Sequence, residues 1–239
     1  MHSNEGARAL GLGLALASSH CLAVGTWGGS VALASDYFVR GITRTNDQAA
    51  LQLDMHYADS SGILAGVFAS NTQIDAVDSR DVELNAYLGV VWTGRADWHG
   101  RVLGGFYAYP WNEAGSSYNY VELDLDLGYQ EWLDLGVSYS PDAPRYIYDR
   151  GMAGVSAESL ELNLQHRMIG KLSANSGVGY YYSGGPGGTG YVYWSAGASY
   201  DLAPVTLAVS YIDTGAGAKK LFYGDAATGR FNATVIWRF

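Results

Sequence analysis

The chain has 239 residues, a formal net charge of −9 and only 15% charged residues, fewer than a soluble globular domain usually carries. This acidic balance argues against a nucleic-acid partner, because neutralising phosphates requires clustered Lys and Arg. The 19 Tyr, 7 Trp and 32 Gly, beside only 5 Pro, indicate aromatic-rich β structure rather than a helical enzyme, and no linker divides the chain into two domains.

Residues 1–23 differ in character from the rest of the chain. Arg8 precedes a run of small and apolar residues up to Ala17, and small residues that a signal peptidase accepts follow. The residue before Cys21 is not small, which argues against a lipid anchor, and a single cysteine excludes an intrachain disulfide. We therefore predict a secretory signal peptide at 1–23 and one exported domain at 24–239.

Beyond the signal, apolar and polar residues alternate with a period of two, the pattern of strands that have one apolar and one polar face. No apolar run reaches the roughly 18 residues of a membrane helix. The alternation predicts twelve strands, near residues 31–39, 51–57, 63–67, 82–92, 103–109, 121–129, 133–139, 160–164, 172–182, 192–200, 205–211 and 231–239.

The fifth predicted strand has the least regular pattern. We place Leu103, Tyr107 and Tyr109 on its apolar face, which leaves Val102 and Phe106 on the other face.

The connections between these strands alternate in length. Short turns are expected at 59–62, 94–98, 130–132, 169–171 and 201–204, and long loops at 110–118, 141–157 and 213–229. An even number of antiparallel strands with short turns at one end is typical of membrane barrels. We predict an all-β fold, a transmembrane antiparallel up-and-down β-barrel of about twelve strands. The alternative is a soluble barrel or sandwich whose apolar face points inward.

Aromatic residues in the apolar phase gather toward both strand ends, as in membrane barrels with an aromatic girdle at each interface. The belt expected at the short-turn end contains Tyr57, Trp92, Tyr129, Tyr200 and Trp237. The belt expected at the long-loop end contains Tyr37, Tyr107, Tyr109, Tyr139, Tyr180, Tyr182 and Tyr211. These belts predict that the protein lies in the outer membrane of a Gram-negative cell, surrounded by membrane lipid and lipopolysaccharide.

If the apolar faces contact lipid, the alternate residues line the lumen. The predicted pore-lining residues are Asp36, Arg40, Asp54, Glu83, Glu122, Asp124, Asp126, Asp134, Glu161, Arg167, Arg230 and Arg238.

Three of these carboxylates, Glu122, Asp124 and Asp126, crowd within about 14 Å on one strand face. The predicted inner faces of the neighbouring strands offer no base to neutralise them.

Arginines come from the first and twelfth strands, which lie opposite the sixth and seventh in a closed barrel of twelve. One interpretation is a transverse field that orients dipolar or zwitterionic solutes and weakly favours cations. The other is pairing of these charges across a narrow, plugged lumen, where they serve only stability.

Other chemistry has weaker support. Three similar acids in a row indicate a wall rather than the acid and nucleophile of a glycosidase, and His56 and His166 lack partners at a diagnostic spacing. Asp75, Asp78 and Asp81 could hold divalent ions, although a solvated loop is the commoner outcome. We predict no catalytic residue, no cofactor and no metal, and therefore no enzyme.

Two segments are similar to those of a known family, the TorF-type porins, which are proteobacterial outer-membrane β-barrels. The first corresponds to the family's N-terminal signature and the second to its mid-chain motif: they are Ser35-Asp36-Tyr37-Phe38-Val39-Arg40-Gly41-Ile42, and Phe106-Tyr107-Ala108-Tyr109-Pro110 followed by Tyr120-Val121-Glu122. The resemblance implies location and topology more than a substrate.

The last strand, which ends at Phe239, resembles the C-terminal signal that the barrel-assembly machinery recognises. The expected function is a porin-like outer-membrane channel for passive diffusion of small polar or charged solutes. The alternative is a non-conducting barrel with a structural or surface-interaction role. The sequence does not predict an oligomeric state.

Overall fold

The computed structural model describes residues 25–73, 81–111, 118–147, 151–222 and 225–239. The predicted signal peptide, and Asp75 and Asp78 of the acidic loop, lie outside these residues. The barrel strands are β1 (Thr26–Ala34), β4 (Ala50–Ala58), β5 (Ile63–Thr72), β6 (Asp81–Thr93), β7 (Trp98–Ala108), β8 (Tyr120–Tyr129), β9 (Leu133–Ile147), β10 (Gly151–Ile169), β11 (Leu172–Ser183), β12 (Thr189–Asp201), β13 (Val205–Thr214) and β14 (Arg230–Arg238).

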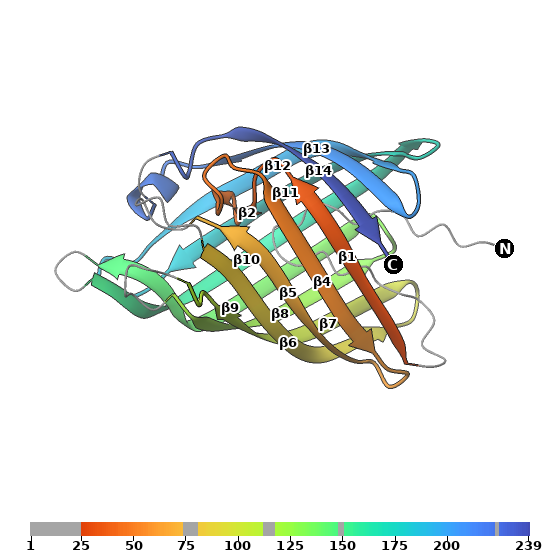
Figure 1. The fold of residues 1–239 in the computed structure, drawn as a ribbon, viewed down its shortest axis with the longest axis horizontal. Helices are drawn as coiled ribbons and strands as arrows, with labels where there is room; N and C mark the ends of the chain where they lie inside the picture. Colours follow the sequence, from red (N-terminus) through yellow and green to blue (C-terminus); the bar gives the residue numbers. More distant parts are fainter. Residues whose placement is uncertain (1–24, 74–80, 112–117, 148–150, 223–224) are drawn as a thin grey trace.

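These twelve strands form one closed antiparallel barrel, in which β4 to β14 follow one another in chain order and β1 joins β4 to β14 (Figure 1). The predicted up-and-down barrel of twelve strands is confirmed. A separate pair, β2 (Phe38–Val39) and β3 (Ile42–Thr43), and a 3-10 helix η1 (Ala218–Lys220) lie in the connections. Within the described ranges, no helix has the length and apolar character that crossing a membrane requires.

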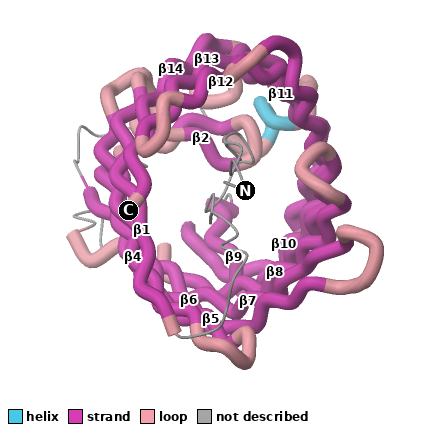
Figure 2. The backbone as a smooth tube through the Cα atoms, turned by 90° about the vertical axis from the view of Figure 1, so that its right-hand side faces the viewer, coloured by secondary structure: helices cyan, strands magenta, loops and turns pink. Residues whose placement is uncertain are grey.

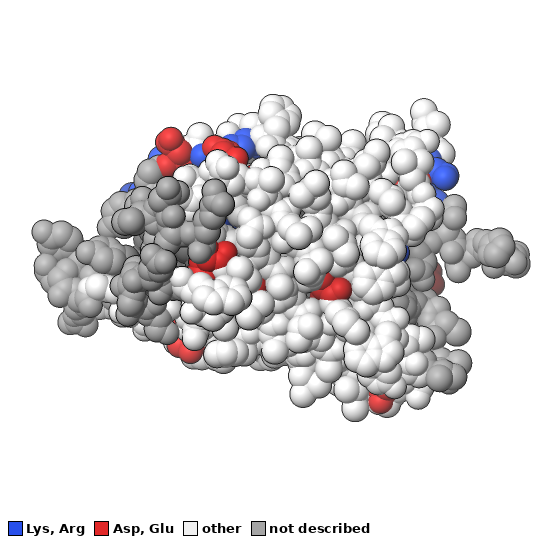
Figure 3. Space-filling model, in the orientation of Figure 1, with Lys and Arg blue, Asp and Glu red and all other residues white. Residues whose placement is uncertain are grey.

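The apolar faces of the strands point outward. Leu33 is 56% exposed, Leu88 61% and Leu160 52%, whereas Glu83 and Glu122 on the polar faces are buried. Uncharged residues accordingly cover most of the face in Figure 3, and the blue Lys and Arg atoms lie near its two ends. The alternative of a soluble barrel with its apolar face inside is therefore wrong.

The last residue closes the barrel. The backbone N–H of Phe239 donates to the carbonyl of Gly29 at 3.1 Å, and the N–H of Gly29 donates back to Phe239 at 3.0 Å. A Cβ on Gly29 would come within 2.8 Å of the Phe239 ring, so the glycine provides the space for that ring beside β1. Terminal residues commonly fray, but here the terminus is part of the β1–β14 seam.

The first strand is displaced from its predicted position. It starts at Thr26 and ends at Ala34, and the chain then turns into the barrel, where Figure 2 shows β2 inside the ring of strands. Residues 35–49, which we call the inner segment, form this excursion. Arg40 (φ +51°) and Gly41 (φ +78°) make the two-residue turn between β2 and β3, because such hairpins need positive φ at both central positions.

The predicted long loop at 141–157 is also wrong. β9 and β10 continue to pair through this region, with Ala143 opposite Val155 and Arg145 opposite Ala153. The guanidinium of Arg145 donates to the carbonyl of Gly184 at 2.6 Å and holds the hairpin against the β11–β12 turn. The hairpin extends from the barrel at the end away from the C-terminus (Figure 1).

Candidate functional site in the barrel lumen

The inner segment is held in place by hydrogen bonds of its own. The carboxylate of Asp36 accepts hydrogen bonds from the hydroxyls of Thr43 (2.5 Å) and Thr45 (2.6 Å). The backbone N–H of Asp36 donates to Asn232 on β14 at 3.2 Å. These bonds fix where the β2–β3 turn lies inside the barrel.

Arg40, at that turn, contacts several walls of the lumen. Its Nη2 donates to Glu122 Oε1 on β8 at 2.8 Å and to Ser138 Oγ on β9 at 2.7 Å. The Tyr191 hydroxyl on β12 donates to the Arg40 carbonyl at 3.0 Å, and the guanidinium lies 5.3 Å from the centre of the Tyr181 ring on β11. Since β8 and β9 lie across the ring from β1, the segment reaches the opposite wall.

Arg40 remains charged in this position. Burial is the largest single effect on its pKa and lowers it, but the charge and hydrogen bond of Glu122 together with the nearby Tyr181 and Tyr120 outweigh burial, and the pKa of the guanidinium is raised above its ordinary value. The structure therefore contains an Arg40–Glu122 ion pair, in agreement with the interpretation in which charges pair across the lumen.

Glu83 joins the two segments that carry the family resemblance. It is 1% exposed and accepts hydrogen bonds from the Tyr37 hydroxyl (3.0 Å), the Tyr109 hydroxyl (2.7 Å) and Asn85 Nδ2 (2.9 Å). Tyr37 belongs to the first of these segments and Tyr109 to the second. The Glu83 hydrogen bonds and the Arg40–Glu122 ion pair are therefore two separate contacts between these two segments, which lie far apart in the sequence.

The orientation of β7 is opposite to the prediction. Leu103 is 4% exposed and Tyr109 5%, whereas Phe106 is 48% exposed. Tyr107 stacks on Tyr120, with 4.4 Å between the ring centroids. Tyr37, Tyr107 and Tyr109 are therefore not girdle residues, and all three lie inside the barrel. β7 has apolar residues in both phases, so alternation alone could not assign its outer face.

This reversal also turns Arg101 inward, where its Nε lies 2.6 Å from Asp126 Oδ2. The expectation that neighbouring strands offer no base to the acidic stripe is thus wrong for Asp126, and Arg40 of the inner segment neutralises Glu122. Asp124 between them has neither an ion pair nor a hydrogen bond among the described residues.

The remaining predicted pore-lining acids lie at several positions on the inner face. Asp54 contacts His56 Nδ1 at 2.7 Å and accepts from the Tyr87 hydroxyl at 2.7 Å. Glu161 accepts a hydrogen bond from the Tyr193 hydroxyl. Asp134 is near the short-turn end of the barrel.

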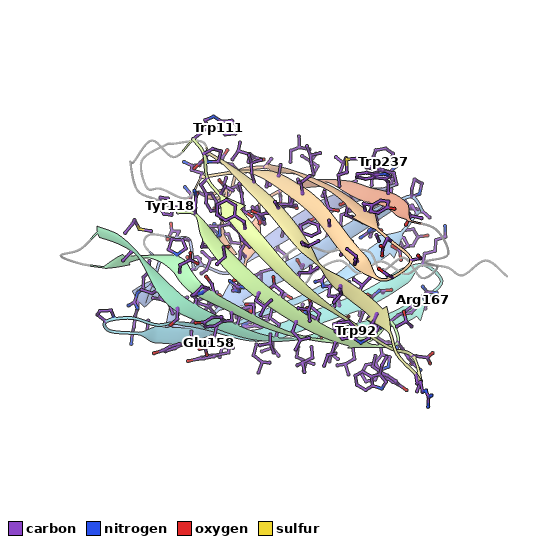
Figure 4. The ribbon with its side chains drawn as sticks, turned by 90° about the horizontal axis from the view of Figure 1, so that it is seen from below. Trp92, Trp111, Tyr118, Glu158, Arg167 and Trp237 are labelled. Carbon is purple, nitrogen blue, oxygen red and sulfur yellow. The ribbon has the colours of Figure 1, made fainter. Side chains whose placement is uncertain are left out.

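The predicted basic residues do not form one wall. Arg230 Nη1 is 3.6 Å from Asp36 and 3.1 Å from Asp47 of the inner segment. Arg238 donates to the Thr206 hydroxyl at 2.9 Å. Arg167 is exposed near the end of β10, on the same side of the barrel as Trp237 (Figure 4).

Nine of the twelve aromatic residues assigned to the girdles lie in the outward phase of their strands. In Figure 4 Trp92 and Trp237 lie toward one end of the barrel, the end where the chain terminates. Further aromatics that the sequence analysis did not assign to a girdle are also exposed, including Trp27 at 68% and Trp98 at 46%. The nine are Tyr57, Trp92, Tyr129, Tyr139, Tyr180, Tyr182, Tyr200, Tyr211 and Trp237.

Several inner residues were not predicted, namely Arg44, Tyr181, Tyr191 and Tyr193. A signal existed for Tyr181, because three consecutive tyrosines at 180–182 must point at least one ring inward in a strand. Arg44 had no such signal, since it lies beyond the first strand in a segment whose inward path no periodicity indicates. Over the described ranges, no three His, Cys, Asp or Glu residues lie close enough together to hold a metal ion.

Known structures share this fold. The KdgM porin is 9% identical at a TM-score of 0.54, and the match covers 89% of this chain and 99% of that one. The NanC porin is 10% identical at a TM-score of 0.54, covering 88% and 98%. The COG4313 outer membrane channel from Pseudomonas putida F1 is 13% identical at a TM-score of 0.54, covering 92% and 97%.

Identities this low show a shared β-barrel fold and nothing finer. A comparison with curated protein sequences finds no match. The family model named Gcw_chp, described as a bacterial protein of unknown function, matches residues 13–238, which is nearly the whole chain. The chain therefore belongs to the Gcw_chp family of bacterial proteins.

Proposed function

We propose that this protein is an outer-membrane, porin-like channel through which small polar or charged solutes diffuse passively. The observation that carries the proposal is the closed twelve-strand barrel with an apolar exterior and a charged interior. A continuous inner face of charged and hydroxyl side chains suits hydrated solutes. The fold shared with the KdgM and NanC porins, and the resemblance to TorF-type porins, support the same function rather than an enzyme.

The surroundings of the channel follow from its outer face. Exposed Leu and Val side chains between two sets of aromatic residues match lipid between two interfaces. We propose export through the signal peptide at 1–23, insertion by the barrel-assembly machinery with Phe239 as assembly signal, and contact with outer-membrane lipid and lipopolysaccharide.

The channel would weakly favour cations over anions. Of the three acids in the stripe, one remains as the source of this preference. Glu122 is paired with Arg40 and Asp126 with Arg101. A paired carboxylate contributes less to the field in a pore than a free one. Asp124 is therefore the member of the acidic stripe that we expect to attract cations.

Liposome swelling tests the channel directly. The folded protein, reconstituted in liposomes, should speed swelling in isotonic arabinose or glycine relative to liposomes without protein. A large oligosaccharide should be excluded, because a twelve-strand barrel has a narrower lumen than a 16-strand porin. Swelling no faster than in the protein-free liposomes would reject passive diffusion.

The second candidate is a closed barrel with a structural or surface-interaction role and no conductance. The contacts of Arg40 with β8, β9 and β12 favour it, since they tie the inner segment across the lumen. Under this candidate, swelling would stay at the protein-free rate although the protein is folded and inserted.

A further inference from the structure

Gly104 on β7 leaves an open slot in the outer wall of the barrel. A Cβ added there would have no atom closer than 3.9 Å apart from its chain neighbours, whereas a Cβ on Gly100 would meet the Trp92 ring and one on Gly190 the Tyr180 ring. Gly104 does not have a positive φ, so its backbone conformation does not require glycine. A glycine inside a strand weakens the strand and often marks a place that a ligand approaches closely.

Strand register places this slot between larger apolar side chains. Leu88 of β6 and Leu123 of β8 are the Cα partners of Gly104, and Tyr139 of β9 continues the same row. Neighbouring strands lie about 4.8 Å apart, so roughly 10 Å separates the backbones that carry the two leucines. The result is an outer groove of about 600 Å³. The other outward side chains that line it are those of Ala86, Phe106, Val121 and Pro141.

The groove suits an apolar occupant. Its outward side chains are all apolar or aromatic, and they are exposed. Tyr87 and Glu122 border it only from the inward phase, because their side chains bond to Asp54 and Arg40 in the lumen. The volume lies within the range of roughly 300–1,000 Å³ that is typical of small-ligand sites.

The groove lies in the half of the wall nearer the long loops. Val121 is the second residue of β8, which begins at that end of the barrel, and Tyr139 is one of the exposed aromatics there. Long loops of membrane barrels are extracellular. In the proposed outer membrane, the lipid of that leaflet is lipopolysaccharide.

We propose that the groove over Gly104 binds an acyl chain of lipopolysaccharide, whose head group lies at the level of Tyr139. The groove is continuous with the outer face that is proposed to contact lipid, and it opens toward the leaflet that holds this lipid. The inference rests on the outer-membrane location given under the proposed function and does not depend on conduction.

Close packing, rather than the hydrophobic effect, holds the chain in the groove, because the surrounding lipid tails are as apolar as the groove itself. The gain in affinity is therefore modest. Glu158, the exposed Cα partner of Tyr139, and the exposed Asp142 place negative charge near this end of the groove (Figure 4). Phosphates of the lipid approach them with a divalent counter-ion, so binding is measured with Mg²⁺ present.

Native mass spectrometry of the folded protein in detergent measures lipopolysaccharide binding over a concentration series. Gly104→Leu fills the slot and should weaken binding by about threefold or more, because the chain loses its packing contacts. Ala196→Leu is the matched control: it adds a leucine at an exposed, outward position of β12, and it should bind as wild type does. Equal affinities in the two variants would overturn the groove.

Leu123→Ala gives a second test that does not depend on the folding of Gly104→Leu. It removes one wall of the groove and should also weaken lipopolysaccharide binding. Wild-type affinity in folded Leu123→Ala would contradict the proposal.

Phosphatidylglycerol, measured in the same way, tests the choice of lipid. Wild type should bind it less tightly than lipopolysaccharide, and equal binding of the two would overturn lipopolysaccharide as the occupant. Self-association that is lost in Gly104→Leu, with lipopolysaccharide binding unchanged, would assign the groove to a second copy of the chain and overturn the proposal.

The groove and the channel can fail separately. Lipopolysaccharide binding that depends on Gly104, in a protein that gives no ion current, would refute the channel and leave the groove standing. An ion current from a protein whose lipid binding is unchanged in Gly104→Leu would refute the groove alone.

Discussion

At the scale of single residues, Tyr109 and Tyr139 distinguish the inner from the outer face. Tyr109 is 5% exposed and donates to the buried Glu83 carboxylate, whereas Tyr139 is 45% exposed on the outer face of β9. Tyr109→Phe should lower the free energy of unfolding by roughly 1–3 kcal/mol, because a buried charge loses a donor. Tyr139→Phe should change it little. Urea unfolding in detergent measures both, and equal effects would contradict the inward orientation of β7.

The acidic stripe gives a second prediction at this scale. Asp124→Asn should shift the reversal potential under a salt gradient toward lower cation preference, because Asp124 has no neutralising partner among the described residues. Asp126→Asn should shift it less, since Arg101 lies 2.6 Å away. A larger effect of Asp126→Asn would show that pairing does not control the field.

Sequence alternation could assign single residues only where one phase was clearly apolar. On β8 the apolar residues and the acids occupy separate phases, so the inner positions of Glu122 and Asp124 could be predicted. On β7 Val102 and Leu103 occupy opposite phases, so alternation does not assign the outer face, and in the structure Arg101 pairs with Asp126 on the inner face. That pairing depends on strand register, which the sequence did not supply.

At the scale of elements, the inner segment is the part of the fold most open to replacement. β1 and β4 pair directly from Ala34–Ala50 onward, so the barrel wall does not need residues 37–45. Replacing these residues with a short Gly-Ser linker should raise single-channel conductance several-fold, because the Arg40 contacts across the lumen are lost. The same linker in the exposed turn at 94–97 is the control. Unchanged conductance would mean that the segment does not narrow the pore.

The closing strand gives a prediction about assembly. Phe239→Ala keeps the backbone bonds with Gly29, which involve only N–H and carbonyl groups, but removes the ring beside Trp237. If Phe239 is an assembly signal, the variant should appear more slowly in its folded, heat-modifiable form in the membrane. Pulse labelling followed by unheated electrophoresis measures this rate. Wild-type kinetics would exclude the signal role.

The inner segment could not be predicted because its pattern continues that of the first strand. Leu33, Tyr37 and Val39 share one phase, so alternation extends the strand across the point where the chain leaves the wall at Ala34. The Arg40–Gly41 pair was the local indication in the sequence that the first strand does not continue through this segment. The β9–β10 hairpin was missed for the opposite reason, because its polar, Gly-containing composition is typical of a loop although the backbone pairs.

At the scale of the whole molecule, strand number, closure and direction of the apolar faces followed from the sequence. Twelve alternating segments with connections of unequal length leave few other topologies. The arrangement of charges in the lumen could not be predicted from the sequence. It depends on the inner segment, which passes through the interior of the barrel and pairs with the opposite wall.

Single-channel recording in planar lipid bilayers tests the central claim most directly. The folded wild-type protein should insert as discrete current steps in potassium chloride, each smaller than those of a 16-strand porin because fewer strands enclose a narrower lumen. Protein that is folded by heat modifiability and inserted in the bilayer, yet gives no current steps, would contradict the channel and favour the non-conducting barrel.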